Sequence, residues 1–455
     1  MSSDVEELQE VVVTALGITK EKAALGYAVT SVGGEQLEAR PEADIARLLR
    51  GKVPGVDITS QSGVTGTGTN IIIRGYTSIS GSNQPLFVLD GVPIDANTYK
   101  DRGFTSGGAT ASSRFLDLDP NNVAEVSVLK GLAATVLYGE AGRNGVVLIT
   151  TKRGSDAAEG AKFTYHGTTT WSTLTVRPET VNAHQFAQLM EEVGLGAENE
   201  MPDYLDYDPQ RQRVFNSLTG EDFDGIDWYD AAYRDWTPQT QHNLSARGRS
   251  NKIGYFVSLG FTDTESAFRA ADFRQNRYNI RANLDAQFND NLSAQVDMSY
   301  FQTTLDRANF GINEMYNRLS TGKPTNLAIF PDPSYASHTG TATPYSPIYA
   351  MRKDFSGSRV DRDNNLRARL ALTYDVPFID GLEATVSINM ETQNEWNKNI
   401  VKQFPLYTYD PSRGEGDAAY VLFGTNQRDR ISCLLYTSDA ADERSSVDLG
   451  GRRII

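Results

Sequence analysis

Residues 69–95 read TNIIIRGYTSISGSNQPLFVLDGVPID, and they contain two short apolar runs joined by a polar segment of Ser, Gly, Asn and Gln. The runs, 71–74 and 86–90, are too short for core helices and are bounded by turn-forming residues. Both are therefore predicted to be buried strands. The stretch as a whole predicts a compact domain whose small strands carry polar loops able to meet a ligand.

The flanking sequence extends this stretch into a small α+β domain. Residues 41–55, PEADIARLLRGKVPG, predict a helix because Ile45, Leu48 and Leu49 share one face and Pro54 and Gly55 end it. The remaining predicted elements are strands at 56–58 and 145–152 and a helical turn near 119–122.

The second half of the chain alternates apolar and polar residues over long segments. Each segment approaches the ~9–11 residues with which a tilted strand crosses a bilayer. Eight such strands are predicted: 163–171, 241–248, 253–261, 274–288, 292–303, 366–376, 382–394 and 420–432. Short turns at 249–252, 289–291 and 377–381 alternate with longer loops, above all 304–364. This asymmetry is typical of outer-membrane β-barrels. The alternative is a soluble β-sandwich, which also has apolar strand faces but explains neither the loop asymmetry nor the charged opposite faces.

Composition excludes several other classes of protein. The net charge of -15 argues against nucleic-acid binding, which requires a basic surface. The single cysteine and four scattered histidines predict no disulfide, no metal and no cofactor. Paired carboxylates such as Asp90 and Asp95 are common in a chain with 58 acids, and no catalytic spacing accompanies them. We therefore expect no enzyme activity and no catalytic residue.

Seven motifs, in order, resemble the TonB-dependent outer-membrane transporters and most closely their SusC/RagA branch. They lie within the first 154 residues: EVVVTALGI (10–18), LLRGKVPGVDI (48–58), IIIRG (71–75), PLFVLDGVPID (85–95), VAEVSVLKG (123–131), ATVLYG (134–139) and NGVVLITTKRG (144–154). Residues 243–263 and 273–285 are similar to early barrel hairpins of that branch.

The resemblance implies an α+β plug domain followed by a partial antiparallel transmembrane β-barrel, with about eight strands present of the roughly 22 that enclose a plugged lumen. The implied function is TonB-dependent import of oligosaccharides or oligopeptides across the bacterial outer membrane, gated by the plug. The implied partners are TonB with its inner-membrane energising complex, a SusD-like surface lipoprotein, the glycan or peptide ligand and outer-membrane lipid. The alternative is a structural or adhesion β-barrel protein without active transport.

The resemblance also assigns candidate site residues. An extended, Val-rich segment can add as a strand to a partner's sheet, and the implied TonB box is Glu10, Val11, Val12, Val13, Thr14 and Ala15. Arg74 and Gly75 are expected to anchor the plug to the barrel wall. The expected ligand-facing plug loops contain Ser78, Ser80, Ser82, Asn83 and Gln84; the alternative is that these are disordered plug loops. Among loop aromatics, Tyr335, Tyr345 and Tyr349 are candidates for stacking on sugars, with packing among the loops as the alternative.

These assignments divide the chain into four parts: 1–20, the TonB-box segment and linker; 21–155, the plug; 156–432, an incomplete barrel; and 433–455. No signal peptide is visible before the TonB box, so we expect Met1 to be an internal start or a fragment edge. An open sheet of eight strands would leave unpaired backbone groups in lipid, so we do not expect this chain to insert as a working channel. The last part, CLLYTSDAADERSSVDLGGRRII, resembles translated sequencing-adaptor DNA and is expected not to be native.

Overall fold

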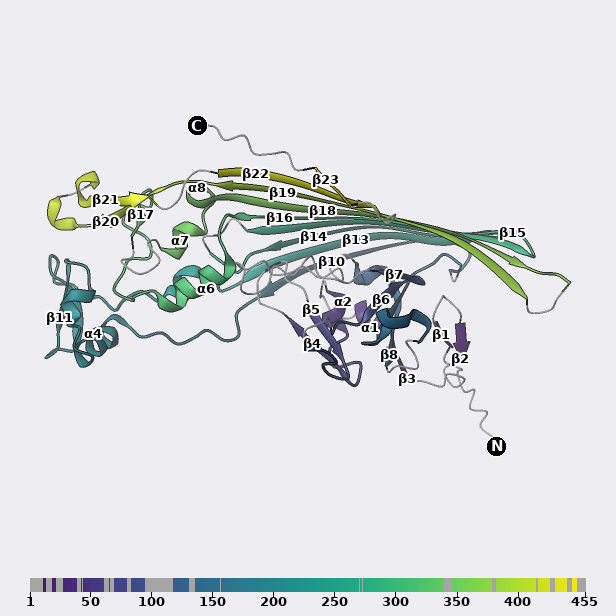
Figure 1. Ribbon diagram of the computed structural model, residues 1–455, viewed down its shortest axis with the longest axis horizontal. Helices are drawn as coiled ribbons and strands as arrows, with labels where there is room; N and C mark the ends of the chain where they lie inside the picture. The colour runs from purple at the N-terminus through teal and green to yellow at the C-terminus, as the bar shows by residue number, and fades with distance from the viewer. Residues whose placement is uncertain are drawn as a thin grey trace.

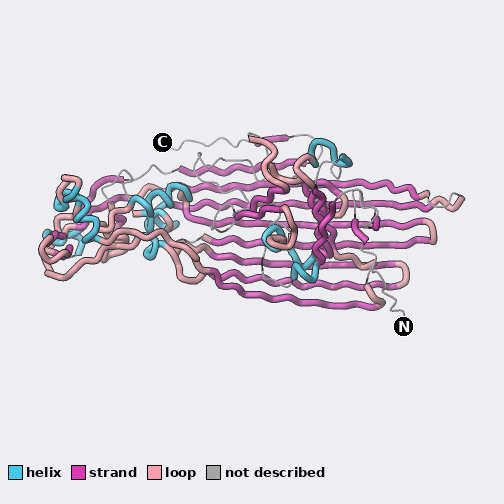
Figure 2. The backbone as a smooth tube through the Cα atoms, turned by 90° about the horizontal axis from the view of Figure 1, so that it is seen from below, coloured by secondary structure: helices cyan, strands magenta, loops and turns pink. Residues whose placement is uncertain are grey.

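The protein consists of a small N-terminal domain lying against one face of a long antiparallel sheet (Figures 1 and 2). The structure is a computed structural model. It describes residues 11–13, 19–21, 28–38, 42, 44–60, 65, 69–79, 83–94, 118–130, 136–155, 157–269, 271, 273–338, 346–378, 382–414, 416–425, 430–439 and 444–447.

The N-terminal domain (residues 28–155) is built on a five-stranded mixed sheet. The strand order is β3 (Ala28–Gly33), β8 (Val123–Lys130), β9 (Val146–Thr151), β6 (Leu86–Leu89) and β7 (Val92–Ile94). β6 runs parallel to β9, and the other neighbours are antiparallel. Beside this sheet lie an antiparallel pair and four short helices: β4 (Val56–Ser60), β5 (Thr69–Ile73), α1 (Gly34–Glu38), α2 (Ile45–Leu48), η4 (Pro120–Asn122) and η5 (Val136–Gly142).

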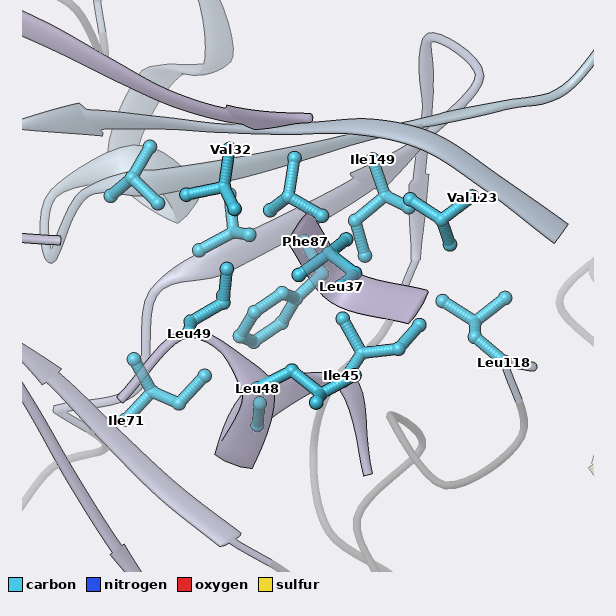
Figure 3. Packing of buried hydrophobic residues seen from close by; sticks show 14 of the residues in the cluster. Val32, Leu37, Ile45, Leu48, Leu49, Ile71, Phe87, Leu118, Val123 and Ile149 are labelled. Atoms are coloured by element: carbon cyan, nitrogen blue, oxygen red, sulfur yellow. The ribbon is translucent and has the colours of Figure 1, made fainter. Parts of the chain in front are cut away.

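One hydrophobic core holds these elements together. The side chains of Ile71, Phe87 and Ile149 meet those of Ile45 and other buried residues from both sheets and the helices (Figure 3). The two strands predicted from the opening stretch, β5 and β6, are thus confirmed as buried strands.

The predicted helix after residue 41 is confirmed in place but is shorter than expected. Asp44 is its N-cap, because its carboxylate accepts a hydrogen bond from the Ala46 amide at 2.9 Å. Asp44 also accepts a hydrogen bond from the Thr69 hydroxyl, which ties the helix to β5.

The long sheet, called here the wall sheet, has nine strands. In spatial order they are β10 (Gly160–Ser172), β13 (Thr237–Ser250), β14 (Ile253–Glu265), β15 (Arg274–Asn289), β16 (Leu292–Ala308), β18 (Gly357–Asp375), β19 (Glu383–Val401), β22 (Arg430–Asp439) and β23 (Arg444–Val447). Seven of the eight predicted strands are confirmed, most of them longer than predicted.

The eighth predicted strand, 420–432, is wrong as a single element. Residues Tyr420–Thr425 form β21, which pairs with β20 (Pro405–Tyr409) in a separate three-stranded sheet with β17 (Ala336–Ser337). The next wall strand is β22, which pairs with β19. The reason lies in the pattern, since Leu422 and Phe423 are adjacent and both about 60% exposed rather than alternating between faces.

The wall sheet carries its apolar residues on its exposed face and its polar residues on its buried face. Leu259 on β14 and Val386 on β19 are 50% and 68% exposed, whereas Asn283 on β15 and Ser258 on β14 are at most 1% exposed. A soluble β-sandwich would bury the apolar face instead. The sheet therefore has the inverted polarity of a barrel wall whose outer face meets lipid.

The longer connections gather at the opposite end from the short turns, here called the loop end (Figure 1). Their packed elements form two hydrophobic clusters. These elements are α4 (Ala183–Glu192), η6 (Ala197–Glu200), β11 (Leu205–Asp208), β12 (Arg213–Asn216), α5 (Trp228–Ala232), α6 (Ile312–Thr321), β17, α7 (Pro347–Ala350), α8 (Lys353–Ser356), β20, η7 (Pro411–Arg413), η8 (Gly416–Ala419) and β21. No helix in the described part of the chain has the length and apolar character needed to cross a membrane.

Candidate functional site

The contact between the N-terminal domain and the wall sheet buries charged side chains from both parts. It begins at the β6–β7 hairpin, whose two-residue turn is Asp90-Gly91. Both turn residues have positive φ, 47° and 83°, as the tight turns that suit a twisted hairpin require. This turn directs Asp90 toward the wall.

Asp90 is bound from both sides of the contact. Within the N-terminal domain its carboxylate accepts hydrogen bonds from the Thr151 amide and hydroxyl, each at 2.9 Å. From the wall it forms an ion pair with Arg281 of β15, and both side chains are at most 6% exposed. Arg369 of β18 donates a hydrogen bond to the Asp90 carbonyl oxygen at 2.5 Å. Asp90 therefore joins β9 of the domain to two wall strands.

Arg153, two residues after β9, makes the second charged connection. Its guanidinium donates to Asp285 on β15 at 2.8 Å and to Asp297 on β16 at 2.7 Å. Burial alone would lower the pKa of Arg153, but the carboxylates of Asp297, Asp90 and Asp285 outweigh it and raise the pKa. The guanidinium therefore stays protonated and bridges two neighbouring wall strands.

Asp119 makes a third, smaller connection. One carboxylate oxygen caps η4 by accepting from the Asn121 amide at 2.9 Å, and the other accepts from Asn243 on β13 at 2.7 Å. Arg247, on the same wall strand, donates to the Arg153 carbonyl at 2.7 Å.

Glycines allow the backbones of the two parts to approach closely. A Cβ atom on Gly154 would lie 1.9 Å from the Tyr255 amide nitrogen, and one on Gly254 would lie 2.6 Å from the Gly154 carbonyl carbon. A Cβ on Gly260 would meet the Asp119 carboxylate at 2.6 Å. At Gly154 and Gly254 the contacting atoms are backbone, so no side chain fits there without a shift of one part.

A cavity of about 190 Å³ lies beside the β6–β7 hairpin. It is bounded on the domain side by Leu89–Ile94 and on the wall side by charged residues that include Arg281, Asp297, Arg367 and Glu391. The hairpin therefore has free volume next to it, while its position is fixed mainly by the ion pairs described above.

The predicted anchor, Arg74, lies elsewhere. It follows β5 with a φ of 59°, is exposed, and its amide donates to the Gly55 carbonyl at 3.0 Å. Within the described residues its side chain has no ion pair with the wall. Gly75, with a φ of 94°, is exposed beside it. Anchoring by Arg74 and Gly75 stays a prediction.

The predicted ligand-facing loop is partly described. Asn83 closes it on itself, because its side-chain oxygen accepts from the Thr77 and Ser78 amides and its nitrogen donates to the Ser78 carbonyl. Gln84 donates to Asn70 at 2.7 Å. Ser80 and Ser82 lie outside the described residues. The ligand-facing role of this loop stays a prediction.

The implied TonB box is also partly described. Val11–Val13 form β1, which pairs antiparallel with β2 (Thr19–Glu21). Glu10, Thr14 and Ala15 lie outside the described residues. One edge of β1 is thus occupied by a short strand of the same chain.

The loop aromatics divide into buried and accessible groups. Tyr349 is fully buried in the loop-end core, and its hydroxyl accepts from the Phe330 amide at 3.3 Å, so it cannot stack on a sugar. Tyr335 is half-buried and stacks on Tyr420 with ring centroids 4.1 Å apart. Tyr345 lies outside the described residues.

The sequence argument missed Asp90, Asp119 and Arg153 as contact residues. A signal was present for Asp90, because an Asp-Gly pair between two apolar runs is the strongest short-range indication of a tight hairpin. No local pattern indicates its partner Arg281, which lies 191 residues further along the chain. The described residues contain no group of three or more His, Cys, Asp or Glu placed to hold a metal.

Comparisons with known proteins agree with this architecture. Residues 21–146 match the family model of the TonB-dependent receptor plug domain. The chain is 28% identical to the TonB-dependent receptor SusC of Bacteroides thetaiotaomicron over 66% of this chain and 27% of SusC. It is also 28% identical to the TonB-dependent receptor P26 of Formosa agariphila over 98% of this chain and 41% of P26.

A solved structure has the same fold. A chain of the RagAB peptide importer in its open-open state superposes with a TM-score of 0.66 at 18% identity, covering 94% of this chain and 46% of that one. The chain thus spans less than half the length of each of these three proteins.

Proposed function

We propose that this SusC/RagA-like TonB-dependent receptor chain is the plug and first wall strands of an importer in the bacterial outer membrane. Its relatives are receptors and transporters rather than enzymes. The N-terminal domain is accordingly called the plug from here on. The observation that carries the proposal is the inverted wall sheet, whose buried polar face holds a folded domain by ion pairs.

Active import needs a plug that is held firmly but can be released. The Asp90–Arg281 and Arg153–Asp285–Asp297 contacts are charge-assisted and largely buried, so they are strong while aligned. Such contacts depend steeply on geometry, and a pull that misaligns them by a few ångströms removes most of their energy. We infer that these contacts form the latch of the plug.

β1 is the proposed handle through which TonB pulls. Its residues are extended and pair antiparallel with β2, a strand of three residues. A two-stranded sheet of this size is marginally stable, so a partner's sheet can replace β2 or add to the other edge of β1.

The proposed ligand is an oligosaccharide or an oligopeptide that enters from the loop end, above the plug. The solved RagAB structure is that of a peptide importer, whereas the name of the TonB-dependent receptor SusC states no ligand. A SusD-like lipoprotein is the proposed partner at the loop end, where the packed loop clusters offer a preformed surface.

A proline substitution in the handle tests the proposal. In the complete gene, Val12→Pro removes an amide donor from β1 and blocks strand addition, whereas Val12→Thr keeps the donor and the β-propensity. We expect Val12→Pro to abolish uptake of labelled oligosaccharide and oligopeptide mixtures while surface binding persists. Unchanged uptake by Val12→Pro would instead support a structural or adhesion protein.

The origin of residues 433–455 is the subject of a separate proposal. We propose that this tail is translated adaptor sequence, on the basis of its likeness to such DNA. β22 pairs part of the tail with β19, and the match to P26 spans nearly the whole chain, so neither observation supports a foreign origin. Resequencing the source DNA decides the matter, since an uninterrupted genomic frame through CLLYTSDAADE would refute the proposal.

A further inference from the structure

Arg307 is a buried arginine that the latch does not use. It lies near the loop end of β16 and is 6% exposed. The register of β16 is continuous from Asp297 to Arg307, so Arg307 faces the same side of the wall as Asp297 and Phe301, which contact the plug. Its guanidinium therefore points to the lumen side.

Arg307 stands directly opposite another arginine. In the wall sheet, Arg307 is directly opposite Arg359 of β18, and Arg359 is directly opposite Asn399 of β19. Like charges directly opposite on neighbouring strands repel. The row Arg307–Arg359–Asn399, called here the arginine row, is thus an unfavourable arrangement in the absence of an anion.

The nearest carboxylate is already committed. Asp361 accepts from Arg359 Nε at 3.0 and 3.2 Å and from the Asn397 side chain. Within the described residues no ion pair or hydrogen bond reaches the Arg307 side chain, and its Nε and Asn399 Oδ1 are buried without partners. One positive charge in the row is therefore unbalanced.

Within the described residues, three other lumen-facing arginines of the wall are paired with carboxylates, whereas Arg307 is not. Arg281 binds Asp90, Arg367 binds Glu391 at 3.0 Å, and Arg359 binds Asp361. A buried charge without a partner is costly, and an outside anion would remove that cost.

The arginine row is accessible from the lumen at one point, and acidic residues lie between it and the plug. Arg359 and Asp361 have side chains about a quarter exposed, so the row is reached from the lumen side at Arg359. Four residue pairs closer to the plug, Asp363 and Glu395 stand opposite each other. These acids repel an anion and confine it to the loop end of the lumen.

We propose that the arginine row is a subsite for an oxyanion group, a carboxylate or a sulfate, of the imported molecule. Arginine presents a planar fork of donors that matches such groups. The Asn399 amide, turned about its last bond, would present its NH₂ to the same anion. That the anion belongs to an imported molecule rests on the proposed import function, but anion binding itself needs no TonB.

The test is equilibrium binding to the purified full-length transporter, with acetate and sulfate as probes against chloride at equal ionic strength. We expect either probe to raise the melting temperature by a few degrees, as binding to the folded state requires. Arg307→Met is expected to lose this shift, while its ligand-free form is no less stable because an unpaired buried charge has been removed.

The matched control is Arg362→Gln. Arg362 lies on β18, the strand of Arg359, but faces outward over the Trp396 ring at 5.5 Å. Its replacement by Gln removes one positive charge, as Arg307→Met does. Arg362→Gln should keep the anion shift. The proposal is overturned if both variants keep it, or if Arg307→Met is strongly destabilised with its anion shift intact, since Arg307 would then be structural.

A second arm identifies the source of the anion. An oligouronate is compared with its carboxyl-reduced form, a sulfated with a desulfated oligosaccharide, and an acidic peptide with its amidated form. In at least one of the three pairs, we expect the charged compound to bind about 10- to 100-fold tighter than its neutral form. Arg307→Met should remove that difference in affinity. Equal binding within all three pairs would overturn the anion subsite while leaving import, measured by the Val12 variants, intact.

Discussion

Asp90 shows how one residue can serve both the local fold and the latch. Its positive φ is needed for the hairpin turn, and Asp tolerates this conformation better than most residues because its short side chain bonds locally. The same side chain accepts from Thr151 and pairs with Arg281. A single residue therefore adopts the backbone conformation that the turn requires and also forms the long-range ion pair.

Neutralising the two partners of this pair, singly and together, tests their coupling. Asp90→Asn leaves a buried Arg281 charge, and Arg281→Gln leaves a buried Asp90 charge, so each should weaken plug retention by about 3 kcal/mol. The double variant places two neutral amides in contact and should cost clearly less than the sum. Protease cleavage of the plug against urea concentration measures the effect. Strictly additive costs would show that the two side chains do not interact.

Gly254 tests the close approach of plug and wall. Gly254→Ala places a Cβ against the Gly154–Ser155 backbone, where no flexible side chain can move aside. We expect a loss of about 1–3 kcal/mol in plug retention by the same proteolysis measurement. Gly33→Ala is the control, because a Cβ there meets nothing within 4 Å. Equal resistance of both variants would contradict the described contact.

At the scale of elements, the strands were predictable and their partners were not. Period-two alternation at 253–261 or 292–303 indicates strand and face directly, because side chains alternate across a sheet. The pairing of Asp90 with Arg281 depends on where a hairpin meets a wall assembled from distant residues, which no local pattern encodes. The 420–432 prediction was wrong because an apolar run was read as alternation, although Leu422 and Phe423 lie side by side and exposed.

The three-stranded sheet at the loop end should be sensitive to acid through His338. This residue follows β17, its amide donates to the Tyr407 carbonyl, and its ring stacks on Phe423 at 3.5 Å. Burial lowers the pKa of His338 below its usual value near 6.5. The neutral form is thus favoured in the folded state, so the unfolded state binds more protons as pH falls below that value.

We therefore expect the β17–β20–β21 sheet to lose stability as pH falls through the usual histidine range and below it. Hydrogen exchange of β20 and β21 amides at pH 7.5 and 5.5, corrected for intrinsic rates, measures this. His338→Gln should remove the pH dependence while leaving exchange at pH 7.5 close to that of the parent. Identical pH dependence in both proteins would assign the effect to another group.

The whole molecule is organised by an inversion of polarity. The wall buries charges against the plug and exposes Leu, Ile, Val and Met on its far face, which only a lipid environment can cover without cost. This inversion explains why mean hydropathy is low although the chain belongs in a membrane, since apolar and polar residues cancel along each strand.

The open wall sheet leads to a prediction for the chain expressed by itself. Within the described residues its strand order ends at β10 on one side and, on the other, at β22 and β23, which lie largely in the tail, so both edges present unpaired backbone groups. In hydrocarbon such groups cost several kcal/mol each, and in water an exposed apolar face with free edges favours aggregation.

We expect the 455-residue chain, refolded into detergent or lipid vesicles, to show no heat-modifiable band on electrophoresis and no conductance. The full-length protein, refolded in parallel, should show a heat-modifiable barrel. A heat-modifiable, conducting species formed by the 455-residue chain would mean that its edges close, by self-association or rearrangement, and that the open sheet is not its state in lipid.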